Sequence, residues 1–404
     1  LSHDTSNSYL IDAGANLSTD GNFVVSTDID GGSRPFGPNY DIGADEWGTG
    51  GVTAIYYSVG TSTAYLDSGT PTLTVTSNLV TFSEAQPDNV GVGDLININN
   101  ALTVAITGRV NASTYTIQSL TGSGIDNIAI GTACSSIKRA FTSLFAAEAG
   151  ADNSGFLGTA DLVIGGYQLN LVCYADGVDT TAVTIDGWTT GANNYIRIYT
   201  PTTTSEVGVS QRHHGTWGAG YRRTNYLYVS DEYVRIEGIA SQEDDDYNIY
   251  VMAIPDRGEI HISHCFLRGV GYARRCIYFA NDTYSKPVTL KIWNCIAINE
   301  STRSTADAII VWDTLLRANV YIYNCTAYSK MAAAYYNVQS NVYVKNCIGT
   351  SGEAATEAFD GTGGGRVEYC ASDDVSADDY GGAGNLTNQS FVFVDEENGD
   401  YHLA

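Results

Sequence analysis

A short phrase recurs five times between residues 260 and 370, and it restricts the fold more than any other feature of the sequence. It reads I-H-I-S-H-C from Ile260, L-K-I-W-N-C from Leu290, V-Y-I-Y-N-C from Val320, V-Y-V-K-N-C from Val342 and G-R-V-E-Y-C from Gly365. Apolar residues alternate within the phrases, which is the pattern of a β-strand with one buried face. The phrases start 30, 30, 22 and 23 residues apart. Repeats of this length are typical of a solenoid.

A second apolar segment recurs inside each repeat and has the composition of a strand. It reads C-I-Y-F-A from Cys276, A-I-I-V-W from Ala308, A-A-Y-Y-N from Ala333 and E-A-F-D from Glu357. No helical 3.6-residue pattern separates the two strands, which excludes leucine-rich and βαβ repeats. The all-β arrangement that remains is a parallel β-helix of about seven to eight rungs.

Two ladders of side chains are predicted inside this coil. Continued alternation places an asparagine on the inside at the end of three strands, at Asn294, Asn324 and Asn346. Stacked asparagines can donate to and accept from one another, which removes the cost of burying them. The adjacent column consists of Cys265, Cys295, Cys325, Cys347 and Cys370. A disulfide between rungs about 4.8 Å apart is geometrically possible, but the odd number of cysteines favours a ladder of buried thiols.

The phrase V/I-x-V/I-x-N-C at this repeat length resembles the right-handed parallel β-helix repeat proteins that are related in shape to pectate lyases. The resemblance implies a right-handed coil and says almost nothing about activity. A second resemblance lies near the N-terminus, in S-Y-L-I-D-A-G from Ser8, T-D-I-D-G-G-S-R-P from Thr27 and Y-D-I-G-A-D-E-W from Tyr40. These phrases resemble the choice-of-anchor segment that closes many bacterial β-helix surface proteins.

In that family the anchor segment follows a phrase like D-Y-H-L, whereas here D-Y-H-L-A stands at residues 400–404. The permuted order leaves three interpretations open: the chain is one unit of a tandem array, the segment folds back onto its own far end, or it docks onto the next molecule. The third is a head-to-tail contact, which propagates into a filament unless it closes into a ring. The predicted docking residues are Leu10, Ile11, Phe23, Ile42, Trp47, Tyr401 and Leu403.

Three regions are predicted along the chain. Residues 1–50 form an extended capping or docking segment, residues 51–130 form a small β-sandwich or barrel-like domain, and residues 131–404 form the β-helix. A capping helix is predicted over residues 135–149, with Ser135 and Ser136 at its start and with an apolar face formed by Ile137, Phe141, Leu144 and Phe145. Such a helix would cover the first rung.

The charge of the chain restricts its partners. The sequence has 45 acidic and 20 basic residues, a net charge of −25. This argues against nucleic acid and anionic membrane as partners, and no apolar run approaches the ~18 residues of a membrane span. A composition with 43 Gly and 28 Tyr is typical of exported β-rich proteins, so an extracellular or cell-surface location is expected.

Candidate catalytic residues exist, but they do not form a complete constellation. Enzymes that cleave acidic polysaccharides need a carboxylate cluster and a basic residue on one face. The candidates are Asp244, Asp245, Asp246, Arg222, Arg223, Arg274 and Arg275. The G-H-G and R-I-K phrases of polygalacturonase-like enzymes are not matched, and His213 with His214 resembles an R-H-x-G-T phrase of long structural turns. The sequence therefore favours a protein without catalytic activity.

Two further types of site, for a metal ion and for glycan attachment, have weak signals in the sequence. Asp28 and Asp30 resemble the start of a Ca²⁺ loop but lack the later ligands of an EF-hand, and an Asx turn is the alternative. No other cofactor is expected. Glycosylation sequons occur at Asn16, Asn111, Asn281, Asn299, Asn385 and Asn388. A seventh, at Asn324, is predicted to be buried and unmodified.

Two functional hypotheses follow. The first is an exported structural protein that assembles head-to-tail with itself into a filament or surface layer. The alternative is a carbohydrate-active β-helix enzyme or a glycan-binding adhesin of the tailspike type, with glycans as partners.

Overall fold

The computed structural model describes residues 52–252, 258–280, 288–313, 317–338, 341–352, 357–361, 365–395 and 400–404. The chain divides into two units, Leu1–Thr53 and Ala54–Ala404, and the second is described below. The predicted docking positions Leu10, Ile11, Phe23, Ile42 and Trp47, the sequon at Asn16 and the Asp28 and Asp30 loop lie outside the described residues.

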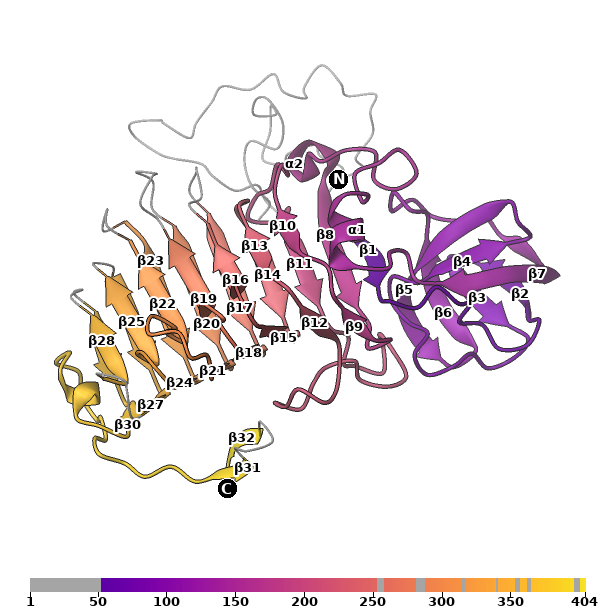
Figure 1. The fold of residues 1–404 in the computed structure, drawn as a ribbon. Helices are drawn as coiled ribbons and strands as arrows, with labels where there is room; N and C mark the ends of the chain where they lie inside the picture. The colour runs from indigo at the N-terminus through magenta and orange to yellow at the C-terminus, as the bar shows by residue number, and fades with distance from the viewer. Residues whose placement is uncertain are drawn as a thin grey trace, which may run out of the picture. The chain divides into compact units, whose positions relative to one another are not determined.

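Most of the second unit is a parallel β-helix, as predicted (Figure 1). A nine-stranded sheet contains, in spatial order, β1 (Thr53–Val59), β8 (Tyr167–Cys173), β11 (Ile196–Tyr199), β14 (Val234–Glu237), β17 (Glu259–Ser263), β20 (Thr289–Trp293), β23 (Asn319–Tyr323), β26 (Asn341–Lys345) and β29 (Arg366–Glu368). An eight-stranded sheet contains β9 (Val178–Asp179), β12 (Arg222–Thr224), β15 (Ala240–Glu243), β18 (Phe266–Gly269), β21 (Ile296–Asn299), β24 (Thr326–Ser329), β27 (Ile348–Ser351) and β30 (Ala371–Ser372). A seven-stranded sheet contains β10 (Val183–Ile185), β13 (Leu227–Val229), β16 (Tyr247–Val251), β19 (Arg275–Ala280), β22 (Ile309–Trp312), β25 (Tyr335–Val338) and β28 (Phe359–Gly361).

The chain passes from the nine-stranded to the eight-stranded and then to the seven-stranded sheet before it starts the next rung. From β8 onward, each strand pairs in parallel with its equivalent in the next rung, for example Ile260 with Leu290 and Leu290 with Val320. The inward residues of all three sheets form one apolar core. Burial of this continuous core stabilises the stack.

The structure contradicts the prediction of a buried asparagine ladder. The three asparagines lie at the corner between the nine-stranded and eight-stranded sheets. Asn294, Asn324 and Asn346 are exposed and adopt the left-handed conformation, with φ of 54°, 53° and 54°. His264 and Tyr369 occupy the same corner in other rungs, both with φ of 53°. Asparagine is common at this position because its short polar side chain tolerates positive φ. The alternation of the strand ends at this corner, so the asparagine does not point inward.

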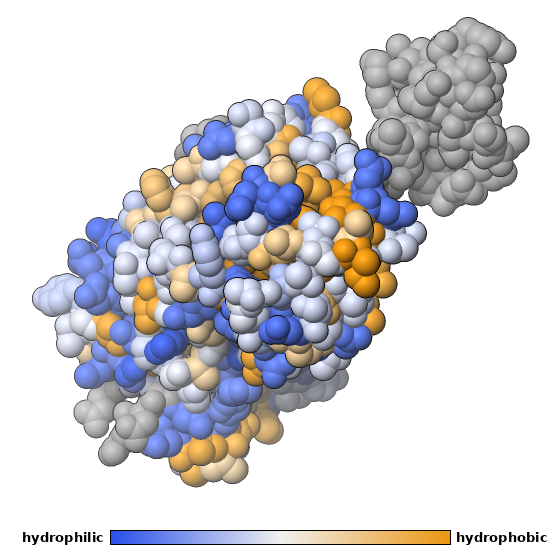
Figure 2. Space-filling model, turned by 90° about the vertical axis from the view of Figure 1, so that its right-hand side faces the viewer, coloured by the Kyte–Doolittle hydropathy of each residue, from blue (hydrophilic) through white to orange (hydrophobic). Residues whose placement is uncertain are grey.

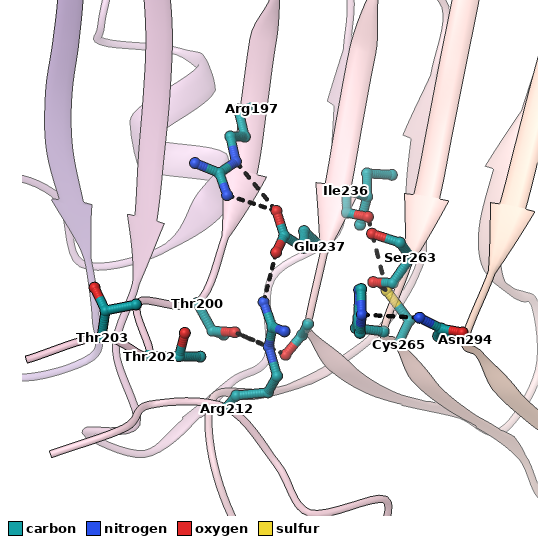
Figure 3. Close-up of polar contacts among 12 residues, drawn as sticks. Arg197, Thr200, Thr202, Thr203, Arg212, Ile236, Glu237, Ser263, Cys265 and Asn294 are labelled. Carbon is teal, nitrogen blue, oxygen red and sulfur yellow. Dashed lines mark hydrogen bonds and ion pairs between the residues drawn. The ribbon is translucent and has the colours of Figure 1, made fainter. Parts of the chain in front are cut away.

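The cysteine column is buried, as predicted. Cys265, Cys295, Cys325, Cys347 and Cys370 are each at most 2% exposed, and all eight cysteines of the chain are free thiols. Each of the five follows a left-handed corner residue directly. Figure 3 shows this corner in two successive rungs, at Cys265 and at Asn294. The Cys265 Sγ atom donates to the Ser263 carbonyl at 3.2 Å. The Asn294 side-chain amide lies 3.0 Å from the His264 ring nitrogen Nε2.

The buried polar column lies at the next corner, between the eight-stranded and seven-stranded sheets. Glu243, Asn299 and Ser329 occupy equivalent register positions and are at most 5% exposed. The Glu243 Oε1 atom accepts the backbone N–H groups of residues 244–246. Asn299 donates to the Asp307 carbonyl at 3.1 Å, and Ser329 donates to the Ala306 carbonyl at 2.9 Å. These side chains satisfy backbone groups where the chain turns.

The helix at the start of the coil is shorter than predicted. Helix α1 spans Leu144–Glu148, and its N-cap is Ser143, whose side chain accepts from Ala146 N. Ser135 and Ser136 instead belong to a strand, β7 (Ile128–Lys138), and Ile137 is buried in the core of a barrel. Leu144 of α1 joins the β-helix core, whereas Phe145 is 54% exposed. A second short helix, α2 (Leu162–Gly165), contacts β8.

The small domain is a closed antiparallel barrel. It contains β2 (Thr72–Thr76), β3 (Leu79–Phe82), β4 (Leu95–Ile98), β5 (Leu102–Asn111), β6 (Thr114–Gln118) and β7. It ends later than the predicted boundary at residue 130, and β1 belongs to the β-helix. Arg139 connects the barrel to the β-helix. It forms buried ion pairs with Asp94, beside the barrel strand β4, at 2.8 Å and with Asp176, between β8 and β9, at 2.7 Å. Figure 2 views this side of the molecule and shows hydrophobic residues in small groups among hydrophilic ones.

The C-terminal residues return along the eight-stranded sheet (Figure 1). Strands β31 (Phe393–Asp395) and β32 (Asp400–Leu403) form an antiparallel hairpin. Tyr401 is 2% exposed, stacks on Tyr328 with ring centroids 6.1 Å apart, and donates to Glu300 at 3.0 Å. Of the two predicted docking residues in this segment, Tyr401 is therefore covered within its own unit, whereas Leu403 is 57% exposed.

The left-handed corner generates a stability prediction. Asn324→Val should lower the free energy of unfolding by about 1–2 kcal/mol, because a β-branched residue is strained at positive φ. Asn324→Gly is the matched control and should change it by less than about 1 kcal/mol. Urea unfolding followed by circular dichroism measures both. Equal stability of the two variants would contradict the corner geometry.

Candidate binding face on the seven-stranded sheet

An outward row of tyrosines lies on the seven-stranded sheet. Inward residues such as Ile249 and Val251 are fully buried, so the period of two directs the residue between them outward. The outward positions of three consecutive strands are Tyr228, Tyr250 and Tyr278, which are partners in register. Their ring centroids are 5.1 Å and 4.8 Å apart along the row. All three side chains are partly accessible.

Two further tyrosines enlarge this row. Tyr226 stacks on Tyr228 with ring centroids 4.2 Å apart, and Tyr247, which is only 8% exposed, supports the row by stacking on Tyr278 at 5.0 Å. We refer to Tyr226, Tyr228, Tyr247, Tyr250 and Tyr278 as the tyrosine face. Aromatic pairs at these distances prefer offset-stacked or edge-to-face contacts. The cluster is therefore a preformed aromatic surface across three rungs.

Charged side chains border the tyrosine face. The Arg274 guanidinium lies 5.6 Å from the Tyr247 ring, and its Nε atom is 3.7 Å from Asp246. Arg275 lies 4.9 Å from the Tyr278 ring and pairs with Asp307 at 3.3 Å. The structure thus brings together three of the catalytic candidates from the sequence, Asp246, Arg274 and Arg275, and adds Asp307. Each of the two arginines has a carboxylate partner.

Two carboxyl groups of this border, those of Asp246 and Asp307, accept hydrogen bonds from neighbouring groups of the protein. Burial raises the pKa of the Asp307 carboxyl, although Arg275 acts in the opposite direction. Asp307 also accepts the backbone N–H of Ala333 at 3.3 Å, and Asp246 accepts the Tyr228 hydroxyl at 2.8 Å. Glycoside hydrolysis needs one carboxyl group that donates a proton and a second that acts as base or nucleophile. Both carboxyl groups here are already engaged by neighbouring donors.

A pocket adjoins one end of the tyrosine face. It is lined by Asn225, Tyr226, Gln242 and the turn at residues 244–246. The three turn N–H groups all donate to Glu243 Oε1, at 3.0, 3.1 and 3.3 Å. Asp244 and Asp245 are exposed on this turn. The side chain of Glu243 therefore fixes the turn that forms the pocket wall.

The other basic and histidine candidates have structural partners. Arg223 is fully buried and donates to the carbonyl groups of Thr181, Asn225 and Tyr226, while the Arg222 guanidinium lies 5.9 Å from the Trp217 ring. His213 contacts the His264 carbonyl at 2.8 Å and the Gly215 N–H at 2.9 Å. Burial lowers the pKa of His213 to about 4, so its ring is neutral near pH 7.

The sequons differ in their accessibility. Asn111 and Asn388 are exposed. Asn299 is fully buried because it caps a turn, so glycosylation at this position is contradicted. The Asn385 amide donates to the carbonyl groups of Val367 and Ala377, both at 2.8 Å. Asn324 is exposed, contrary to expectation, and Asn281 lies outside the described residues.

Searches for metal sites, membrane-spanning helices and known relatives add no functional assignment for the described residues. Among the residues whose placement is described, no group of three or more His, Cys, Asp or Glu side chains could hold a metal ion. No helix in this part of the chain is long and apolar enough to cross a membrane. The sequence matches no protein-family model and no curated protein. The three parallel sheets show a parallel β-helix fold.

The sequence carried a signal for the tyrosine face. The segments L-Y-V at 227–229, I-Y-V at 249–251 and I-Y-F at 277–279 each have tyrosine between two apolar residues. Comparing the second strand of successive repeats, rather than the first, would have found the row.

Proposed function

We propose that this protein is an extracellular, non-catalytic glycan-binding protein whose tyrosine face binds a neutral polysaccharide chain. The observation that carries the proposal is the register of Tyr228, Tyr250 and Tyr278 on three consecutive rungs. A row of this kind provides repeated aromatic contacts for a ligand that is itself a repeating polymer.

The chemistry of the face supports a neutral sugar. An aromatic ring with a polar tip packs against the C–H side of a sugar and also hydrogen-bonds its hydroxyl groups. Asp246 and Asp307 neutralise the bordering arginines, so the border offers hydrogen bonds without an unbalanced charge. Burying an unpaired charge against a neutral ligand would be costly, and this pairing avoids that cost.

Substitution of the central tyrosine tests this function. Tyr250→Ala should weaken binding of a neutral polysaccharide at least tenfold, because loss of one stacking ring removes about 1.4 kcal/mol or more. Tyr65→Ala is the matched control, since Tyr65 is 66% exposed and lies outside the face. Titration calorimetry against a panel of neutral polysaccharides measures affinity, and a reducing-end assay measures cleavage. The proposal fails if no neutral polysaccharide binds, if both variants bind equally, or if the bound chain is cleaved.

A second candidate function is head-to-tail self-assembly. It is supported by exposed apolar side chains on and beside the C-terminal hairpin, namely Val392, Val394 and Leu403, which are 67%, 56% and 57% exposed. Exposed apolar groups of this kind are common in interaction sites. Because Tyr401 is buried by Tyr328 and Phe393, the proposed contact uses the outer side of the hairpin and the N-terminal segment of a neighbour.

Deletion of residues 1–47 tests self-assembly. The shortened chain should remain folded and monomeric, whereas the full chain should form end-to-end particles in electron micrographs. Leu403→Lys in the full chain should also abolish these particles, because it places a charge in the apolar contact. Val110→Lys on the barrel, where Val110 is 60% exposed, is the matched control and should leave the particles intact. Particles that survive the deletion would exclude docking through the N-terminal segment.

A further inference from the structure

The outer face of the nine-stranded sheet carries a second ordered row of side chains. Seven consecutive rungs present cationic or aromatic residues at one register position: Arg197, Arg235, His261, Lys291, Tyr321, Tyr343 and Arg366. The neighbouring position adds Trp293 and Tyr323, which are also partners in register. We refer to these nine residues as the basic-aromatic strip.

The row of seven contains no acidic residue, although the chain has 45 acidic and 20 basic residues. The side chains point outward, because the flanking residues on the same strands, such as Leu290 and Ile292, are buried. Successive rungs lie about 4.8 Å apart, so the cations Arg235 and Lys291 lie one rung before and one rung after His261. Glu237, Glu259 and Glu368 lie on the same strands, so the positive charge is concentrated at the register position of the row itself.

Aromatic rings form a pocket beside the last of these cations. Lys291, Trp293, Tyr321 and Tyr323 line it together with the edge of Ile292. Tyr321 stacks on Tyr343 with ring centroids 5.4 Å apart, and it meets Tyr323 edge-on at 6.1 Å. Tyr323 is 39% exposed. Ring faces and a flexible ammonium group therefore meet at one accessible place.

Three members of the strip, Arg197, His261 and Lys291, already pair with carboxylates of the protein. The Glu237 carboxylate forms ion pairs with the Nη2 atoms of Arg197, at 2.6 Å, and of Arg212, at 2.7 Å (Figure 3). Glu259 receives Lys291 at 2.8 Å and also pairs with His261. Burial acts to raise the pKa of both glutamates. The basic side chains paired with them have the larger combined effect, so the pKa of each glutamate is lowered. The environment of the strip therefore favours ionised carboxylates.

We propose that the basic-aromatic strip is a second binding site, independent of the tyrosine face, and that it takes a glycan whose sugar rings carry carboxylates. The rings of the glycan pack on Trp293 and Tyr323, and its carboxylates meet Lys291 and Arg235. Charge-assisted hydrogen bonds of this type are stronger than neutral ones. The strip does not favour an extended acidic peptide, because peptides that pair with a sheet use an edge strand, whereas β20 and β23 are internal strands whose edges are both occupied.

Matched ligands test this inference on the full chain. Titration calorimetry would compare a β-1,4-linked glucuronate hexamer with cellohexaose, which has the same linkage and lacks the carboxylates. The acidic hexamer should bind at least tenfold more tightly, and its affinity should fall as salt is raised from 50 to 500 mM, because salt screens the charge contacts. Equal binding of the two hexamers, or no binding of the acidic one, would overturn the proposal.

Matched variants locate the site. Lys291→Met and Tyr323→Ala should each weaken binding of the acidic hexamer at least tenfold, with circular dichroism unchanged. Lys330→Met is the control, because Lys330 is exposed and lies outside the strip, and Tyr250→Ala should also leave this affinity unchanged. Equal losses for Lys291→Met and Lys330→Met would exclude the strip. Equal binding of a glutamate hexapeptide would exclude a sugar-specific site. Failure of the tyrosine face in its own test would not change these outcomes.

Discussion

In each of the five repeated phrases, the residue directly before the cysteine adopts the left-handed conformation at the corner between the nine-stranded and eight-stranded sheets. Asn294, Asn324 and Asn346 adopt this conformation at a positive φ close to 54°, which few residues other than glycine tolerate. The corner ends the alternation of one strand and lets the following cysteine point inward. The regular corner keeps successive strands in register, and register places equivalent side chains above one another. The apolar core and both outer rows depend on it.

This constraint links the stability of the coil to its surface chemistry. A residue directed outward in one rung is stacked on its equivalents in the rungs before and after it. The side chains of a row such as Tyr228, Tyr250 and Tyr278 therefore repeat along the surface at the spacing of the rungs. The tyrosine face and the basic-aromatic strip differ in charge. Both surfaces contain ion pairs with carboxylates of the protein, but the row on the nine-stranded sheet also holds Arg235 and Arg366 at the same register position.

The repeats were sufficient to predict the coil, because their spacing and two-residue alternation are local properties of the sequence. The direction of the Asn324 side chain was predicted wrongly, because the alternation rule assumes that the strand continues. The rule cannot detect a left-handed corner that ends the strand. The helix was predicted too long because Ile137 suits both a helical and a strand period, and pairing with β4 decides between them. The tyrosine face was missed since it requires the register of three rungs, which loops of unequal length conceal.

The inward direction of the cysteine column tests the register most directly. All eight cysteines are buried free thiols, and five of them depend on the left-handed corner. Reaction with a thiol reagent such as 5,5′-dithiobis(2-nitrobenzoic acid) would be measured on the native protein and again in denaturant. The account predicts that no thiol reacts rapidly in the native state and that all eight react after unfolding without a reducing agent. Rapid native reaction of Cys295, Cys325 or Cys347, or fewer than eight thiols after unfolding, would contradict it.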